Sequence, residues 1–417
     1  MSEIAETDVL IAGAGLAGAS LALALSREGF DVTLVDPQPF EAQLAPTFDG
    51  RSTAIAFATY RMLHTLGLGE DLAPHACRMD RILVTDGRRP GAAARAPSAA
   101  FLRFDADEIG AATGGEPLGY MIENRRLRVA LARALGDTDV TVRAPVGVTA
   151  VETGIGRSTV TLSDGSRVRA SLVVGAEGRR SIVRDAAGIG VIRQPYGQSG
   201  VVATVRMAQP HGNVAHEYFL PGGPFAILPL TDQRASLVWT EPTRAAEALR
   251  GASDAAFRSH LNRRFGEFLG EVRPEGPRFV YPLELSLATA LVAPRVVLIG
   301  DAAHGVHPVA GQGLNMGLKD VAALTEVLAD ARRLGEDIGA EPVLDRYARW
   351  RRFDTVALTL AFDAFVKLFS NDIAPVRAVR DLGMAAVNRI APLRRAFMHE
   401  AGGATGDLPR LLRGEAV

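Results

Sequence analysis

The chain has 417 residues, with 46 lysines and arginines against 47 aspartates and glutamates, and is therefore almost neutral. Its length allows two or three domains with a large buried core, and its charge balance argues against general nucleic-acid binding. The only cysteine is Cys77, which excludes an internal disulfide and is typical of a protein kept in a reducing cytoplasm.

Several local patterns exclude further classes of protein. Neither lysine, Lys319 or Lys367, follows a glycine, so the sequence has no Walker-type phosphate loop, and it has no G-x-S-x-G nucleophile turn. Residues 9–25 carry no charge, but the acidic residues before them and their three glycines disfavour a signal peptide or a membrane helix. Almost every basic residue is arginine, and this bias lowers the weight of arginine clusters such as residues 125–128.

The first motif is VLIAGAGLAG at residues 9–18, which predicts a strand, a G-x-G-x-x-G turn and a helix over residues 16–27. The first glycine permits a tight turn, the second lets a pyrophosphate approach the helix N-terminus, and the third lets helix and strand pack closely. A second strand at 32–35 ends in Asp36, placed to accept hydrogen bonds from a ribose hydroxyl. The candidate phosphate-binding residues are Gly13, Gly15, Leu16, Ala17 and Gly18.

The middle of the chain alternates helical and strand patterns up to about residue 190. A helix is expected over 124–135 because Leu127, Leu131 and Leu135 are spaced four apart. Helices are also expected over 52–66 and 180–187, and a loop over 87–100, which is rich in glycine, alanine and proline. The expected strands are 81–85, 146–152, 159–162, 167–170 and 172–175.

From residue 200 the pattern becomes rich in strands, and we expect a separate sheet built from 201–207, 215–220, 226–230 and 235–240. A helix is expected near 255–268, a buried strand at 296–299 and a long helix at 313–333. Across 353–369 polar residues recur every fourth position on an otherwise apolar helix. That helix could pack on the protein itself, on a second subunit or on a lipid surface.

Several short motifs together carry a family resemblance. A hydrophobic strand is followed by Gly300-Asp301, and the chain also contains Asp49-Gly50-Arg51, a glycine-rich turn at 175–178, and the phrases at 122–124, 219–224, 226–230 and 406–414. With the N-terminal glycines, these resemble group A flavoprotein monooxygenases of the aromatic-hydroxylase type, and more narrowly the ubiquinone-biosynthesis hydroxylases.

The resemblance implies an α/β fold, in which a Rossmann-like FAD-binding domain carries an inserted β-rich substrate domain and a C-terminal helical region. The FAD-binding domain would comprise residues 1–80, 105–190 and 286–340. The substrate domain would comprise 81–104 and 191–285, and the helical region 341–417.

The resemblance also implies roles for individual residues toward FAD. Asp301, after Gly300, should bond the ribityl chain, although it could be only a helix cap. Arg51 should lie near the flavin or the pyrophosphate, unless it is an ordinary surface arginine, and Asn124 should hydrogen-bond FAD. The residues expected to present their backbone to the flavin ring at a helix N-terminus are Gly311, Gln312, Gly313, Leu314 and Asn315.

The substrate pocket is expected where the β-rich domain faces the flavin. Its candidate residues are Phe219, Phe225, Ile227, Leu228, His307 and Pro308, and the four sheet residues could equally be ordinary core. His304 and His307 are three apart, but no metal site is expected because suitable further ligands are missing nearby.

The implied reaction is hydroxylation of the aromatic ring of a polyprenyl phenol in ubiquinone biosynthesis, with dioxygen as substrate and a flavin C(4a)-hydroperoxide as oxidant. The cofactor carries this chemistry, so no catalytic side chain is assigned. NAD(P)H or another donor would supply electrons; the donor stays open because Glu177-Gly178 replaces the usual Asp-Gly. The alternatives are another flavoprotein oxidoreductase and a flavin-bound, non-catalytic subunit of a biosynthetic complex.

We expect a cytoplasmic protein. Peripheral association with the inner membrane, membership of a biosynthetic complex and self-association stay open at this point, since each would follow from a different use of the apolar helix at 353–369.

Overall fold

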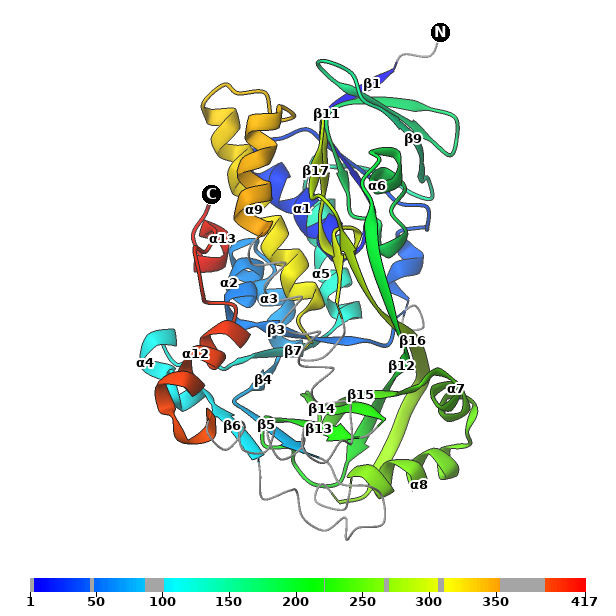
Figure 1. Cartoon of the computed structure of the whole chain (residues 1–417), viewed down its shortest axis with the longest axis vertical. Helices are drawn as coiled ribbons and strands as arrows, with labels where there is room; N and C mark the ends of the chain where they lie inside the picture. The colour runs from blue at the N-terminus through cyan, green and yellow to red at the C-terminus, as the bar shows by residue number, and fades with distance from the viewer. Residues whose placement is uncertain are drawn as a thin grey trace.

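The computed structural model describes residues 4–45, 49–86, 101–220, 222–265, 270–306, 311–352 and 387–417. In these residues the strands form two large sheets and one small one, and the helices pack around them (Figure 1). None of the helices within the described ranges is long and apolar enough to cross a bilayer. The apolar stretch 353–369 and the expected loop 87–100 lie outside the described residues.

The first sheet carries the N-terminal glycine motif. Its central strands are parallel and fully buried along most of their length, which explains their continuous runs of valine, leucine and isoleucine. In spatial order it comprises β17 (Val292–Ala293), β18 (Val296–Leu298), β11 (Arg167–Gly175), β1 (Ala5–Ala12), β2 (Val32–Val35) and β8 (Thr141–Arg143), with β10 (Ser158–Leu162) and β9 (Val148–Glu152) attached to β11. The strands at the two glycine motifs, β1 and β18, therefore flank the same neighbour, β11.

Helices cover this sheet and share one hydrophobic core with it. The predicted face of Leu127, Leu131 and Leu135 is confirmed, because all three are at most 3% exposed. The principal helices are α1 (Leu16–Arg27), α5 (Asn124–Gly136) and α9 (Gly313–Arg333), which lie together beside β1 and β11 in Figure 1. A further helix occupies residues 341–352, and α6 (Ile182–Ala186) follows β11.

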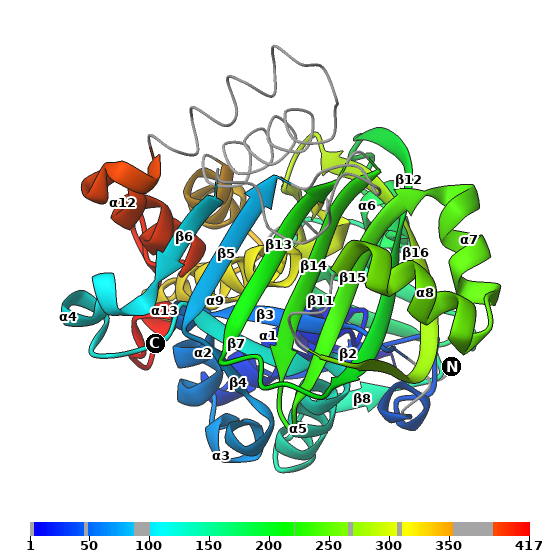
Figure 2. The same cartoon turned by 90° about the horizontal axis from the view of Figure 1, so that it is seen from below.

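The second large sheet confirms the expected β-rich unit and is seen face-on in Figure 2. Two strands of 17 residues each pair along their whole length and link it to the rest of the chain. Helices α7 (Thr243–Gly251) and α8 (Asp254–Phe265) pack on one face. The strand order is β19 (His304–Gly305), β16 (Val272–Ala288), β12 (Val191–Met207), β15 (Arg234–Pro242), β14 (Gly223–Leu230), β13 (Val214–Leu220), β5 (Arg81–Asp86) and β6 (Phe101–Asp105).

The small sheet corrects one expectation. Residues 52–66 were expected to be helical throughout, but the first five form β3 (Ser52–Ala56), and helix α2 (Phe57–Thr65) starts only after them. The strand forms because β7 (Gly119–Glu123) supplies antiparallel hydrogen-bond partners along its length, and local helix preference is weak against such pairing. With β4 (Cys77–Met79), these strands pack on residues of β13 and β14.

The remaining helices are short or lie near the C-terminus. They are α3 (Gly69–Leu72), α4 (Gly110–Thr113), α12 (Ala391–Ala401) and α13 (Arg410–Arg413). The β16 strand and helix α7 had no predicted counterpart, because β16 contains prolines and glycine and α7 is a short, mostly alanine and arginine segment.

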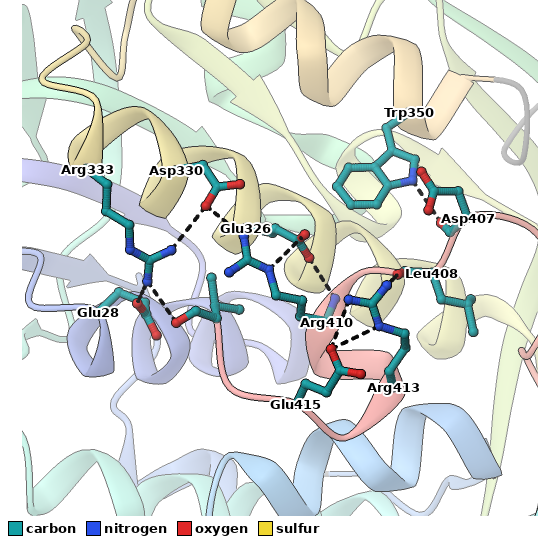
Figure 3. A network of polar contacts seen from close by, with 11 residues as sticks. Glu28, Glu326, Asp330, Arg333, Trp350, Asp407, Leu408, Arg410, Arg413 and Glu415 are labelled. Atoms are coloured by element: carbon teal, nitrogen blue, oxygen red, sulfur yellow. Dashed lines mark hydrogen bonds and ion pairs between the residues drawn. The ribbon is translucent and has the colours of Figure 1, made fainter.

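The C-terminal segment is tied to α9 by charged side chains (Figure 3). Arg410 pairs with Glu326 at 3.0 Å and with Asp330 at 2.7 Å, and its backbone amide also donates to Glu326. Arg333 at the end of α9 bonds Glu28 of α1 and the backbone oxygen of Val417. These contacts attach the chain end to both helices that carry the glycine motifs.

We expect Arg410→Ala to lower the free energy of unfolding by about 1–2 kcal/mol, because the two partly buried charge-assisted contacts of the guanidinium disappear while the backbone bond to Glu326 stays. Arg413→Ala is the matched control: it bonds Glu415 two residues later and the Leu408 carbonyl, and both charged side chains are about half exposed, so the expected loss is under ~0.5 kcal/mol. Urea unfolding of both variants checks this, and equal losses would contradict it.

Candidate functional site

The two glycine motifs, far apart in sequence, touch each other in the structure. Gly300 has a φ of +57° and lies against Ala17 of α1, so that a methyl group on Gly300 would be 3.4 Å from the Ala17 side chain. A methyl group on Gly317 of α9 would lie 3.2 Å from the Gly300 Cα atom. The turn after β18, the start of α1 and the first turns of α9 therefore converge at one edge of the first sheet.

The N-terminal turn has the backbone geometry expected of a phosphate-binding loop. Gly13 has a φ of +102°, and a side chain there would collide with the Ala176 carbonyl at 2.5 Å. A side chain on Gly18 would overlap the Gly13 carbonyl, whereas Gly15 faces open space. Gly15 therefore stays accessible at the start of α1, whose first turn carries no acidic residue, so the helix N-terminus favours an anion.

A pocket opens beside this helix start. Its lining residues are Ala14, Gly15, Leu16, Ala19, Phe40, Gln43, Leu44, Arg128 and Leu131. Backbone amides at a helix N-terminus and apolar walls suit a nucleotide diphosphate, so the residues fit the adenosine diphosphate half of FAD.

Asp36 holds the glycine turn itself. Its two carboxylate oxygens accept from the backbone amides of Ala14 and Gln38, both at 2.8 Å. Asp36, the predicted ribose ligand, thus directly follows β2. Its side chain also stabilises the glycine turn. Carboxylate oxygens have further lone pairs, so these bonds are compatible with a ribose contact.

A buried carboxylate organises the next part of the site. The side chain of Asp49 is 3% exposed and accepts from Arg51 at 2.9 Å, Arg128 at 2.8 Å and Asn124 at 3.2 Å. Tyr281 of the second sheet reaches the same carboxylate at 3.3 Å, and the Arg51 guanidinium stacks on the Tyr281 ring at 4.9 Å. Asp49 therefore joins helix α5, which shares the core of the first sheet, to the second sheet.

The charges of this cluster support one another. Burial alone would raise the pKa of Asp49, but the hydrogen bonds and charge of Arg51, with the bond from Arg128, hold the pKa well below its usual range. The pKa of Arg51 is raised: burial opposes this, while Asp49 chiefly and the nearby Tyr281 and Asp301 favour the charged form. Arg51 is half exposed and lies close enough to Asp301 to interact electrostatically.

Two residues of helix α5 support this cluster. Asn124 is 4% exposed and bonds Asp49 and Thr53, so its side chain supports the Asp49 cluster, and its contact with FAD stays a prediction. Arg128 belongs to an arginine cluster whose weight we had lowered for compositional bias. It is a buried partner of Asp49 and lines the pocket at α1. Arg128 lies on the same helical face as Asn124, four residues earlier. This spacing could have identified Arg128 from the sequence.

Asp301 stays accessible where a ribityl chain is expected. Its side chain is 48% exposed, and the nearest ion-pair partner is Arg179 at 3.6 Å. Glu177, in contrast, turns away from this point, because its carboxylate accepts from Ser181 at 2.7 Å and from the amide of Val183 at 3.0 Å. Burial raises the pKa of Glu177, although these bonds lower it. The replacement of Asp by Glu thus serves the start of α6.

A second buried carboxylate supports the Gly300 turn and was missed in the sequence. Asp320 of α9 accepts from the Gly300 amide at 3.0 Å, from His304 at 2.6 Å and from Arg351 at 2.8 Å. Burial would raise the pKa of Asp320, but the charges of His304 and Arg351 lower it. His304 is thus engaged with Asp320, and His307 lies outside the described residues. Within the described ranges no group of three potential ligands is arranged around a metal position.

The start of α9 is the predicted flavin-ring segment, and its backbone is partly accessible. Asn315 is 1% exposed and binds β3 from both ends of its amide: it accepts from Ala56 at 3.0 Å and donates to the Ala54 carbonyl at 2.8 Å. Gly311 has a φ of +63° and lies against Ala54. The side chain of Asn315 therefore fixes the start of α9 to β3. The residues from Gly311 to Leu314 are half-buried at the N-terminus of the helix.

Four of the predicted pocket residues lie in the second sheet, and their side chains point to two opposite faces of it. Phe225 and Ile227 are at most 1% exposed and pack in the core beneath α7 and α8. Phe219 and Leu228 point to the other face, where Leu228 meets residues of β4 and β7 and Phe219 packs on Val84. Pro308 and His307 lie outside the described residues, so the structure does not place them.

The chain belongs to the family described as the FAD binding domain, whose model matches residues 6–358. It is 47% identical to the ubiquinone hydroxylase UbiL of Rhodospirillum rubrum over 98% of this chain and 92% of that protein. It is 36% identical to the 3-demethoxyubiquinol 3-hydroxylase of Escherichia coli K12, over 95% and 98% of the two chains.

A solved structure supports the same fold. The p-nitrophenol 4-monooxygenase PnpA of Pseudomonas putida DLL-E4 superposes with a TM-score of 0.78 at 19% identity, over 97% of this chain and all of that one. The Rossmann-like domain and the additional large sheet expected from the sequence are thereby confirmed as the fold class.

We expect Asp49→Asn to cost roughly 3 kcal/mol of unfolding free energy at neutral pH, since it leaves the buried Arg128 and the Arg51 guanidinium without their counter-charge. The folded-state pKa of Asp49 lies below its unfolded value. Its contribution is therefore present above about pH 4 and is lost as the pH falls further.

Urea unfolding at neutral pH and at about pH 3 tests this. The difference between Asp49→Asn and wild type should shrink in acid, while the control Asp254→Asn, whose carboxylate is largely exposed, should differ little from wild type at either pH. An equal difference at both values would show that Asp49 acts through shape and not through charge.

Proposed function

We propose that the protein is an FAD-dependent monooxygenase that hydroxylates the aromatic ring of a polyprenyl phenol in ubiquinone biosynthesis, with dioxygen as co-substrate and NAD(P)H as electron donor. The observation that carries the proposal is the meeting of Gly300 with Ala17 and Gly317, which forms one continuous backbone surface for a long dinucleotide beside a second sheet. The two hydroxylase relatives, similar over nearly their whole length, support the substrate class.

We propose the following division of labour for the cofactor. The α1 turn, including Leu16 and Ala17, holds the diphosphate, with Asp36 near the ribose. Asp301 bonds the ribityl chain, Arg51 lies beside the flavin, and Gly311 to Leu314 face its ring. Residues 1–80, 105–190 and 286–340 form the FAD-binding domain, 81–104 and 191–285 the substrate domain, and 341–417 the C-terminal region. Of the four predicted pocket residues in the second sheet, we propose that Phe219 and Leu228 line the substrate pocket and that Phe225 and Ile227 do not.

Bound reduced FAD supplies the activation of dioxygen. The residues of this chain then have three tasks: the α9 start places positive helix-dipole potential at the ring, the second sheet orients an apolar phenol over it, and their contact limits water. The Asp49 cluster, through Tyr281, keeps the sheet at a defined distance from the cofactor-binding domain.

A non-catalytic flavin subunit was the main alternative, and Glu177 was its only support in the sequence. Glu177 caps the start of α6, so its presence is explained without any loss of catalysis. No specific contact in the described residues favours the scaffold function.

The reaction is tested with purified holoenzyme and ortho-farnesylphenol. We expect a flavin absorption spectrum, NADH or NADPH oxidation that the phenol stimulates, and a hydroxylated product formed in step with oxygen uptake. Absence of phenol-stimulated oxygen uptake with either donor, in protein that retains its flavin, would contradict the monooxygenase proposal and favour the scaffold function.

The cofactor site is tested separately with Asp301→Ala. FAD affinity should fall by roughly 1–3 kcal/mol, the usual cost of deleting a charged hydrogen-bond partner. Asp185→Ala is the control, because that carboxylate is 69% exposed and lies outside the proposed site. Fluorescence titration of the apoprotein with FAD measures both variants. Unchanged affinity for Asp301→Ala would show that this residue only shapes the turn.

A further inference from the structure

The second sheet has two chemically different faces, and its register shows which residues share each face. Glu217 of β13 pairs with Val84 on one side and with Ala226 on the other. Paired residues in neighbouring strands point to the same face, so the row continues across the sheet. Its other described members are all apolar: Leu102, Val84, Ala226, Val238, Val202 and Phe279.

This row faces the proposed cofactor. At one end, the Phe279 ring fills the space beside Gly50, where a methyl group would come within 2.1 Å of it. The residue two positions before Glu217, Ala215, lies on the same face and packs with Ala54 of β3. Ala54 in turn contacts Gly311 and accepts a hydrogen bond from Asn315. Glu217 is therefore about 7 Å further along the strand from the wall of the flavin-ring segment.

The Glu217 carboxylate has an unusual position for a charged group. It lies deep in the molecule, yet its side chain keeps some accessible surface, as do Val238, Leu228 and Phe279 on the same face. The opposite face is closed, with Phe225, Ile227 and Trp239 at most 1% exposed. Within the described ranges Glu217 has no ion-pair or hydrogen-bond partner that would account for a buried carboxyl as a structural support.

We propose that Glu217 is the polar anchor of the substrate pocket: its carboxyl group binds the phenolic hydroxyl of the apolar substrate and accepts the proton of that hydroxyl during ring hydroxylation. This inference rests on the proposed function. A lone polar group on an apolar wall fixes the orientation of a ligand that has a polar head and an apolar body.

The proton transfer balances within the proposed reaction. The O–H bond of the phenol breaks and its proton moves to a carboxylate oxygen of Glu217, while the electron pair left on the phenol oxygen increases electron density in the ring. A ring carbon forms the new bond to one oxygen atom of dioxygen as the O–O bond breaks, and the second oxygen atom leaves as water. Two electrons come from NAD(P)H through the cofactor. The hydroxylated ring carbon then loses its hydrogen as a proton, which makes the ring aromatic again, and Glu217 returns its own proton to the phenolate oxygen. The ring proton, the hydride of NAD(P)H and one solvent proton supply the hydrogens of the water and of the new hydroxyl group.

The electrostatics suit such a base. Burial raises the pKa of Glu217 to about 8, within the range in which a group can take up a proton from a phenol near neutral pH. Among the described residues, the other titratable groups on this face include Cys77 and Tyr281, whose pKa values burial raises to about 11 and about 12. They also include Arg234 and Arg206, which are ion-paired with Glu123 and Glu275. Among these described groups, Glu217 is thus the one whose pKa lies near 8.

The pH dependence follows from the sign of this shift. The ionised fraction of Glu217 grows as the pH rises through about 8, so kcat for ring hydroxylation should rise and level off above that value. Because its pKa is raised, Glu217 binds a proton more tightly in the folded protein than in the unfolded chain. Glu217 therefore stabilises the fold at about pH 4 and below, and this contribution is lost as the pH rises toward 8.

The test compares wild-type holoenzyme with Glu217→Gln and Glu217→Leu, using ortho-farnesylphenol. Glu217→Gln keeps a hydrogen-bonding amide but cannot take the proton, so kcat should fall about 100-fold or more with little change in KM, and the pH dependence should flatten. Glu217→Leu should also raise KM. Both variants should keep wild-type FAD content, and their melting temperatures at pH 8 should be at or above that of wild type.

A surface variant and a binding measurement complete the design. Glu247→Gln, at an exposed position on α7, should behave as wild type. Phenolate absorbance should appear when wild-type holoenzyme binds ortho-farnesylphenol above about pH 8 and be missing in Glu217→Gln. Wild-type kcat and pH profile in Glu217→Gln would overturn the inference while leaving the proposed function intact. If wild type ionises the bound phenol but does not hydroxylate it, the proposed function fails and the role of Glu217 in binding stands.

Discussion

The whole arrangement depends on the close approach of three backbone segments at the edge of the first sheet. Gly300 lies against Ala17 of α1 and against Gly317 of α9, with no room for larger side chains between them. The parallel pairing of β1 and β18 with β11 brings these segments to the same edge. A cofactor that spans both glycine motifs can be bound only if this contact is maintained, because each motif supplies only one part of the binding surface.

Two buried carboxylates maintain this contact from different sides. Asp320 connects α9 to the Gly300 turn and to Arg351, and Asp49 connects the Arg51 turn to α5 and to Tyr281 of the second sheet. Burying such groups is costly unless each is fully paired, and both accept bonds from at least two positively charged or polar partners. The fold thus places its charged pairs beneath the site and leaves Asp301 and the start of α9 accessible above it.

The second sheet has a different task on each of its faces. One face closes a hydrophobic core under α7 and α8, while the other stays partly accessible and carries the Glu217 carboxyl within a row of otherwise apolar described residues. Alternation along a strand makes this separation strict, since a shift by one residue would exchange the two faces. Because of this alternation, the predicted pocket residues lie on opposite faces of the sheet, with Phe219 and Leu228 on one and Phe225 and Ile227 on the other.

The sequence by itself determined the features that depend on neighbours along the chain. The glycine turn before α1, the acidic end of β2 and the long α9 helix follow from local spacing and were predicted with nearly their observed bounds. The β-rich unit was also predicted, but without β16 and the first half of β12. Only the tertiary structure decided which side chains bind the protein itself. Asn124, Asn315 and Glu177 support neighbouring backbone, and Arg128 and Asp320 are buried partners of distant residues. The strand β3 formed because of a partner about 70 residues away. Burial and pairing depend on contacts between segments distant in sequence, and a local pattern carries no information about which distant group will lie opposite.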